Sequence, residues 1–143
     1  MKSEKHVTED VRWKQRLASF EKAMRLLREP FARDLSSLSA LEHEGVAQRF
    51  EFAFELAWKT LKDYLESEGQ RIEPLTPKQV IKVAFNVHAI EDGQVWIDML
   101  THRNKLAHTY DESNLKSALG EVRDRYLQAL QSALTWLTAR SSS

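Results

Sequence analysis

Apolar residues recur at spacings of three and four through most of the chain, a pattern typical of amphipathic α-helices. The first such stretch covers about residues 8–28, and Pro30 follows its end. The second runs from about Ser39 to Glu68, where Gly69 closes it. The apolar positions are Trp13, Leu17, Phe20, Met24 and Leu27 in the first stretch, and Phe50, Ala53, Phe54, Ala57, Trp58, Leu61 and Leu65 in the second. Each stripe predicts a helix with one face in a core.

Three further helices are predicted in the second half of the chain. A short helix has Thr76 as its candidate N-cap and Pro77 at its first position, another starts after Gly93, and the last covers about residues 111–140. Their apolar positions are Val80, Val83, Ala84 and Val87, then Trp96, Met99, Leu100 and Ala107, then Leu115, Ala118, Leu119, Val122, Tyr126, Leu130, Ala133 and Leu137. Short connections favour antiparallel neighbours. We therefore predict an all-α fold, an up-and-down antiparallel helical bundle of four long helices plus one short helix.

Length and composition narrow this picture. A chain of 143 residues is predicted to form a single domain, 1–143, with its core at about 8–140. Its 21 basic and 21 acidic residues leave no global basic field, so RNA would meet only a local patch. The absence of Cys removes thiolate nucleophiles and Cys-ligated zinc. With neither a signal-peptide pattern nor a membrane-spanning apolar run, we expect a cytoplasmic protein that does not enter a membrane.

The second helix carries apolar residues on two sides. Phe52 and Leu56 project opposite to the stripe that contains Phe54 and Leu61. One bundle does not bury both faces of a helix. Two interpretations are open: these residues cover the core under the first connection, or they form a homodimer interface.

Arg103 is an anomaly, because it falls in the middle of the apolar stripe of the fourth helix at ~100° per residue. A guanidinium keeps its charge and is costly to bury unpaired. Either a carboxylate meets it inside the bundle, for which Glu51 and Glu55 are the natural partners, or it lines a cleft open to an anion. Both arrangements can coexist.

His108 follows Arg103 by five residues, about 140° round an ideal helix, so the two side chains diverge unless the helix ends between them. The segment after it is poor in helix formers, so we expect the helix to end there and His108 to lie at the junction. An imidazole can accept a proton from a ribose 2′-hydroxyl, and a guanidinium can stabilise charge on phosphate oxygens. Arg103 and His108 thus form a candidate catalytic set for phosphoryl transfer without a metal. Asn104 and Lys105 are candidate substrate-binding residues, and Tyr110 can bind, orient or be modified.

Other candidate sites are weaker. Scattered His and carboxylate residues on charged helices usually face solvent, and these do not match a metal-ligand spacing; they are His88, Glu91, Asp92, Asp98 and His102. The sequence has no glycine-rich phosphate loop. We predict no metal and no cofactor.

The segment from Arg103 to Tyr110 matches the motif Arg, four residues, His, one residue, Tyr of the HEPN superfamily. The stretch 50–65, with Phe50, Phe54 and Trp58, resembles the branch called nucleotidyltransferase substrate-binding proteins, and so does 92–100. The resemblance covers about residues 15–134.

This resemblance implies a helical bundle that dimerises and pairs with a separately encoded small nucleotidyltransferase, often as a toxin and antitoxin. It also implies that Arg103 and His108 of two protomers form a metal-independent ribonuclease site, which the partner silences by adenylylating Tyr110. Members of this branch were first viewed as non-catalytic subunits that present a nucleotide or other substrate. Three functions therefore remain open: an endoribonuclease, a nucleotide-binding subunit, and a bundle in which Arg103 serves only an internal ion pair.

Overall fold

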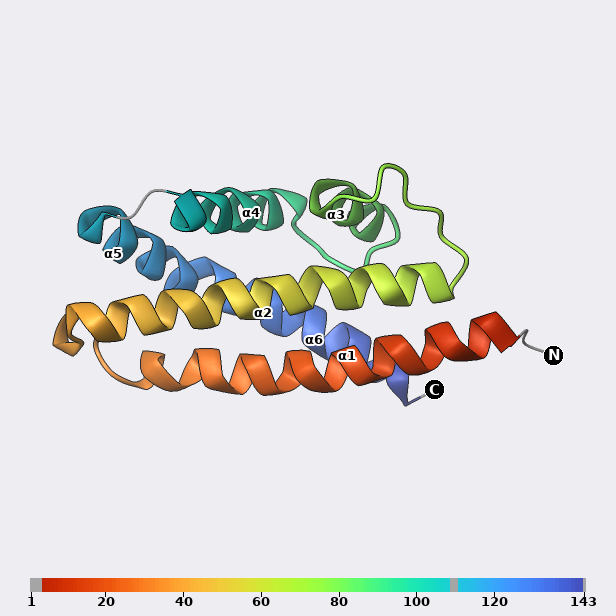
Figure 1. Cartoon of the computed structure of the whole chain (residues 1–143), viewed down its shortest axis with the longest axis horizontal. Helices are drawn as coiled ribbons and strands as arrows, with labels where there is room; N and C mark the ends of the chain where they lie inside the picture. The colour runs from red at the N-terminus through yellow and green to blue at the C-terminus, as the bar shows by residue number, and fades with distance from the viewer. Residues whose placement is uncertain (1–3, 109–110, 143) are drawn as a thin grey trace.

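The computed structural model describes residues 4–108 and 111–142, with side chains from residue 8 and without that of His108. Two long helices, α1 (Glu4–Arg28) and α2 (Ala40–Ser67), lie antiparallel and side by side along the molecule (Figure 1). Short 3-10 turns, η1 (Glu29–Ala32) and η2 (Leu35–Ser37), connect them. This pair forms the platform on which the rest of the bundle packs.

Local signals set the limits of α2. The Ser39 hydroxyl accepts a hydrogen bond from the Glu42 amide, and the Glu42 carboxylate accepts one from the Ser39 amide, which completes a capping box. At the other end Gly69 has a φ of 86° and donates to the Glu66 carbonyl. Both ends agree with the sequence prediction.

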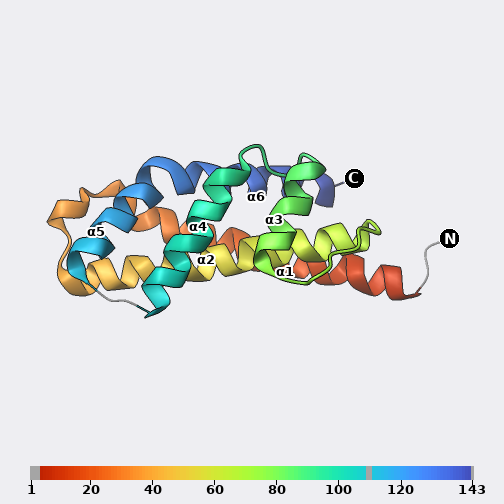
Figure 2. The same cartoon turned by 90° about the horizontal axis from the view of Figure 1, so that it is seen from above.

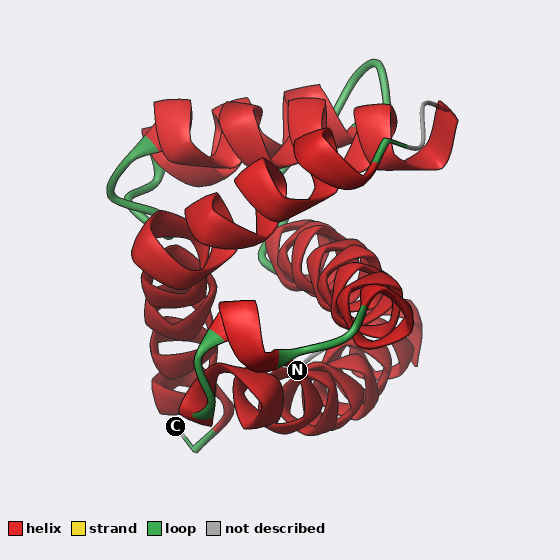
Figure 3. Ribbon diagram, turned by 90° about the vertical axis from the view of Figure 1, so that its left-hand side faces the viewer, coloured by secondary structure: helices red, strands yellow, loops and turns green. Residues whose placement is uncertain are grey.

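The second half of the chain supplies α3 (Pro77–Asn86), α4 (Gly93–His108), α5 (Glu112–Glu121) and α6 (Leu127–Ser141). In the view of Figure 1, α6 lies behind α2. Seen from above, α3 and α4 cross α2 obliquely (Figure 2). The view along the long axis shows helices and connections and no strand in the described part of the chain (Figure 3). The predicted all-α bundle is confirmed.

The last predicted helix differs in one respect. Between α5 and α6 lies a π-helical segment, η3 (Val122–Tyr126), and the two helices change direction there (Figure 2). A π turn adds a residue to the helical repeat, which rotates all later side chains relative to a regular α-helix. In the sequence this shift appears only as two successive apolar spacings of four, Val122 to Tyr126 to Leu130, which a regular helix also contains.

Nearly all the predicted stripes are buried. The residues 0–2% exposed include Trp13, Phe20, Phe50, Phe54, Leu61, Trp96, Met99, Tyr126 and Leu137. A smaller cluster, Leu38, Val46, Ala47, Leu115 and Leu119, closes the end where α2 begins. Two positions differ from the prediction. Ala107 is exposed, because it lies beyond the part of α4 that packs on the core. On the second face of α2, Phe52 is 61% exposed and does not cover the core, whereas Leu56 is partly buried and packs against it.

Candidate functional site

The helix that carries the candidate motif is fixed at its start and along its inner face. The Asp92 carboxylate accepts hydrogen bonds from the amides of Gln94 and Val95, at 3.1 and 3.3 Å, and so caps α4. Trp96 and Met99 are almost fully buried, and the Trp96 ring lies 6.1 Å from that of Phe54 on α2. These contacts set the rotation of α4 against α2.

This rotation directs Arg103, one helical turn beyond Met99, toward α2. Its Nη2 lies 3.2 Å from Oε2 of Glu55, and its guanidinium carbon lies 5.9 Å from the Phe54 ring centroid. The side chain is 26% exposed. Its Nε is buried and has no hydrogen-bond partner among the described residues. One edge of the guanidinium is therefore paired, while part of its donor set remains unused.

The two candidate carboxylates differ. Glu55 also accepts a hydrogen bond from Trp58 Nε1 at 3.1 Å and pairs with Lys59 Nζ at 3.3 Å, so its charge is shared among three donors. Burial raises the pKa of Glu51 above its ordinary value, although Arg103 acts in the opposite direction. The Arg103 ion pair in the described structure is thus to Glu55, with Glu51 beside it.

Arg103 lies at the edge of a groove of about 760 Å³ between α1, α2 and α4. Apolar side chains form part of its wall, and Gln48, Arg49 and Glu51 add polar groups. The lining residues are Ala23, Leu26, Gly45, Gln48, Arg49, Glu51, Phe52, Glu55, Arg103 and Ala107. We call this hollow the Arg103 groove. Gln48, Arg49 and Leu26 were not expected from the sequence, because nothing in periodicity alone shows which exposed positions of two helices face the same hollow.

A second hollow of about 550 Å³ shares Gln48, Glu51 and Ala107 with the Arg103 groove. It reaches Leu106 and Leu115, beside the junction of α4 and α5. The two hollows together form a continuous surface from Arg103 to the end of α4. A ligand larger than a single phosphate therefore has room beside the motif.

The remaining motif residues occupy the last turns of α4. The helix is continuous through His108, so it does not end between Arg103 and His108, and the junction with α5 follows His108 as expected. Thr109 and Tyr110 lie outside the described residues, and the His108 side chain does too. Asn104 and Lys105 are exposed, and Lys105 faces α5 rather than the Arg103 groove. Asp111 then caps α5 by accepting a hydrogen bond from the Ser113 amide.

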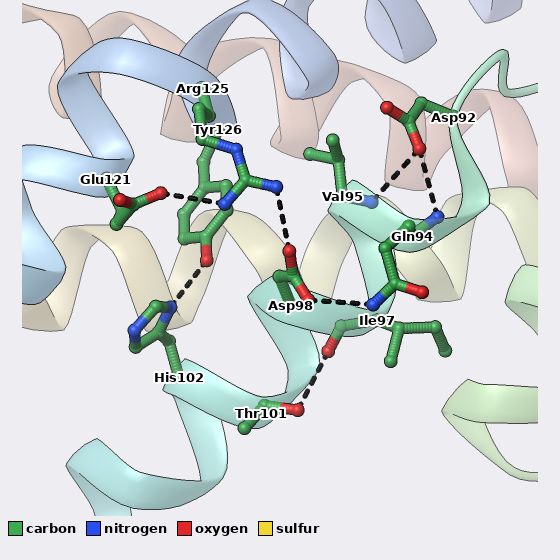
Figure 4. A network of polar contacts seen from close by, with 10 residues as sticks. All are labelled: Asp92, Gln94, Val95, Ile97, Asp98, Thr101, His102, Glu121, Arg125 and Tyr126. Atoms are coloured by element: carbon green, nitrogen blue, oxygen red, sulfur yellow. Dashed lines mark hydrogen bonds and ion pairs between the residues drawn. The ribbon is translucent and has the colours of Figure 1, made fainter.

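A polar network that the sequence did not reveal joins α4 to the π segment (Figure 4). Nδ1 of His102 lies 2.5 Å from the Tyr126 hydroxyl, and Arg125 donates to Asp98 at 2.7 Å. Arg125 also pairs with Glu121 at 2.8 Å. His102 and Asp98 were expected to face solvent, and both are instead half-buried and partnered. The contact joins residues 24 positions apart on separate elements, so helical periodicity did not locate it.

Neither a metal centre nor a membrane-spanning helix is found in the described part of the chain. Among those residues, no group of three His, Cys, Asp or Glu side chains lies close enough to hold a metal ion. Within the same ranges, 4–108 and 111–142, no helix is long and apolar enough to cross a bilayer.

The protein is thus an α-helical bundle in which a groove lined by Arg49 and Arg103 lies beside an Arg-x4-His segment. A family model described as nucleotidyltransferase substrate binding protein like matches residues 15–139. The chain belongs to this family, which confirms the resemblance seen in the sequence.

Individual relatives agree with this assignment. The protein named "Probable ribonuclease HepT" from Haemophilus influenzae is 25% identical over 88 residues, 59% of this chain and 60% of that protein, so the match spans less than two thirds of the relative. A solved structure from Thermus thermophilus is 32% identical with a TM-score of 0.70, covering 81% of this chain and 96% of that one. A Haemophilus influenzae structure described as the fold of a substrate binding domain of a nucleotidyltransferase has a TM-score of 0.63 at 22% identity, covering 90% and 98% of the two chains. This last likeness concerns the fold alone.

Proposed function

We propose that this protein is a metal-independent endoribonuclease that pairs with a separately encoded small nucleotidyltransferase as a toxin and antitoxin. The observation that carries the proposal is the position of Arg103, whose guanidinium is 26% exposed at the edge of a groove, pairs through Nη2 with Glu55, and has no partner for Nε among the described residues. A cation held in this way is preorganised for an anionic group, and part of its donor set is free to bind one. The similarity to a protein named as a ribonuclease supports an RNA phosphate as that group.

The reaction needs one proton acceptor and one charge stabiliser. His108 takes the proton of a ribose 2′-hydroxyl, whose oxygen attacks the adjacent phosphorus. The bond from phosphorus to the 5′-oxygen breaks, and a cyclic phosphate forms. The leaving oxygen receives a proton from water or from a second imidazole, and Arg103 stabilises the negative charge on the phosphate oxygens. Protons and electron pairs balance without an oxidant or reductant.

The geometry of α4 favours a site shared between two protomers. Since the backbone of α4 is helical through His108, positions 103 and 108 are separated by about 140° round the helix axis. A phosphate that touches Arg103 of one chain is better placed for His108 of a partner chain. The exposed Phe52 beside Arg103 supports a homodimer through the Arg103 groove.

Regulation by the nucleotidyltransferase belongs to the same proposal. Tyr110 follows His108 by two residues, so an adenylyl group on its hydroxyl would place a phosphate and a base beside the catalytic residues. This bulk and charge would exclude RNA. After co-expression with the proposed nucleotidyltransferase partner, the intact mass of the protein is expected to rise by one or more adenylyl groups, which peptide mapping should locate on Tyr110.

The proposal is tested by RNA cleavage in the presence of a chelator. The wild type is expected to cleave RNA, leaving cyclic phosphate ends. Arg103→Met and His108→Asn are each expected to lower the rate by about a hundredfold or more. Arg71→Met is the matched control, because Arg71 is exposed and pairs with Glu73 away from the groove.

The free energy of unfolding distinguishes a catalytic role of Arg103 from a role in an internal ion pair alone. Both partners of the Arg103–Glu55 pair are partly exposed, so Arg103→Met should lower the free energy of unfolding by only about 1 kcal/mol. Intact RNA with the wild type, or a fully active Arg103→Met variant, would refute the ribonuclease function.

The shape of the Arg103 groove supports a second candidate, a nucleotide-binding subunit without chemistry of its own. Leu26, Phe52 and Ala23 offer an apolar wall for a base while Arg103 meets the phosphates. Calorimetry with nucleoside triphosphates, alone and with the nucleotidyltransferase, should then show binding that Arg103→Met abolishes. Absence of binding in both conditions would eliminate this candidate.

A further inference from the structure

The helix α4 has two polar flanks, and only one of them faces the Arg103 groove. His102 projects from the other flank, toward α5 and the π segment. There a hollow of about 350 Å³ lies between α4 and α5. Its lining residues are His102, Lys105, Leu106, Asn114, Ser117 and Ala118, and we call it the His102 pocket.

His102 is held in a defined orientation at this pocket. Its ring contacts that of Tyr126, with centroids 5.5 Å apart, and Nδ1 lies 2.5 Å from the Tyr126 hydroxyl. Burial raises the pKa of Tyr126 to about 12, so the hydroxyl keeps its proton and can donate it to Nδ1. A neutral imidazole then carries its hydrogen on Nε2, which points away from Tyr126 (Figure 4). In this tautomer the ring offers an Nε2–H donor in one orientation.

The other polar residues of the pocket are also donors. Lys105, Asn114 and Ser117 form no ion pair or hydrogen bond with other residues in the described part of the chain, in contrast to Lys116, which pairs with Glu112. No carboxylate is among the lining residues. The Lys105 charge is also felt at His102, whose pKa is lowered by burial first and by Lys105 second. An ammonium, an amide, a hydroxyl and an imidazole thus surround one hollow that lacks a negative charge.

A set of donors that includes a lysine ammonium, with no carboxylate in the lining, fits a phosphate group. Because Arg103 and His102 are neighbours on α4, a strand that crosses the exposed face of the helix at Asn104 passes from one flank to the other. We propose that the His102 pocket binds a second phosphate of the RNA strand whose scissile phosphate lies at Arg103. The inference rests on the proposed ribonuclease function. It states that the substrate is a single RNA strand whose phosphates bind on both flanks of α4.

The test measures RNA binding separately from RNA cleavage. A labelled single-stranded RNA with 2′-O-methyl groups at every position lacks the nucleophile and reports binding alone. Its affinity for the full chain is measured by fluorescence anisotropy over a series of salt concentrations. Loss of one phosphate contact reduces the slope of log affinity against log salt by about 0.7 for a single strand.

We expect the variant Lys105→Ala/Asn114→Ala to bind severalfold more weakly, with a slope reduced by about 0.7. Arg103→Met should reduce the slope by a similar amount, and the two losses should add. The control is Lys116→Ala, which removes an exposed lysine of α5 that does not line the pocket, and it should retain the wild-type slope. Lys105 and Asn114 are exposed, so both variants are expected to fold, which circular dichroism checks.

Each outcome decides a different point. If the wild type cleaves RNA but the double variant keeps its slope, the pocket inference is overturned and the ribonuclease function stands. If RNA stays intact but the slope depends on Lys105 and Asn114, the chemistry is refuted and the phosphate site is supported. Absence of RNA binding at low salt overturns both. Inorganic phosphate is the last probe. If it displaces the labelled RNA when the two are present at equal concentrations, the pocket is a site for free phosphate and the inference is overturned.

Discussion

Arg103 owes its position to its neighbours on α4 rather than to its own charge. Met99 and Trp96 are buried one and two turns earlier, and the helical repeat carries that direction to Arg103 at the edge of the core. The sequence predicted this, since a charge inside an apolar stripe is visible without a structure. His102 was missed, because its partner Tyr126 lies 24 positions later and appeared only as a core residue.

The half-buried imidazole of His102 predicts a pH dependence of stability. Its pKa is lowered from its ordinary value of 6.5, so the unfolded chain takes up a proton near pH 6.5 while the folded chain does so only at lower pH. The wild type should therefore lose stability as pH falls through 6.5, and His102→Gln should lose less. Urea unfolding of the wild type and of His102→Gln at about pH 7.5 and about pH 5.5 measures the two losses of stability.

The exposed residue His88 provides the control, since His88→Asn suits its positive φ of 65°. It should retain the wild-type loss of stability between the two pH values. An equal loss in wild type and His102→Gln would show that His102 stays in contact with solvent in the folded protein.

At the scale of elements, α4 is the part of the fold that organises both flanks of the site. Its cap, its core contacts and its bonds to the π segment fix its rotation and its length. The sequence located the start of α4 correctly, because Asp92 and Gly93 are recognisable there. It did not reveal that the last helix contains η3, since a π turn changes the repeat for five residues and leaves the hydrophobic pattern nearly intact.

The cap of α4 leads to a stability prediction. Removal of the carboxylate that accepts from Gln94 and Val95 should lower the free energy of unfolding by about 1 kcal/mol. Asp92→Ala is therefore expected to be less stable than Glu91→Ala, which removes an equal charge from the exposed neighbouring residue. Chemical denaturation of both variants makes the comparison, and equal stabilities would show that the cap contributes nothing.

At the scale of the whole molecule, the groove exists because α1, α2 and α4 meet at angles that leave a hollow beside Arg103. Residues from three helices line it, and the most exposed large apolar side chain among them is Phe52. The sequence left two interpretations of Phe52, and the structure removed the one in which it covers the core. The other interpretation, in which Phe52 forms part of a homodimer interface, is the one we propose.

The proposed homodimer predicts that Phe52→Asp shifts the protein toward monomer in sedimentation equilibrium. Its unfolding free energy as a monomer should change little, because Phe52 is 61% exposed in the single chain. Leu41→Asp, which changes another exposed apolar residue of α2 outside the Arg103 groove, should leave self-association unchanged. A wild type that is monomeric at high concentration would contradict the shared site.

The sequence by itself determined the helices, their caps and most of the buried positions, because helical periodicity and capping depend on residues within a few positions of one another. It also singled out Arg103, whose anomaly is local. Only the tertiary structure decided that Glu55 is the ion-pair partner, that Phe52 is exposed, and that His102 meets Tyr126. These outcomes depend on the angles between helices and on one π turn, which arise from the packing of side chains far apart in the chain.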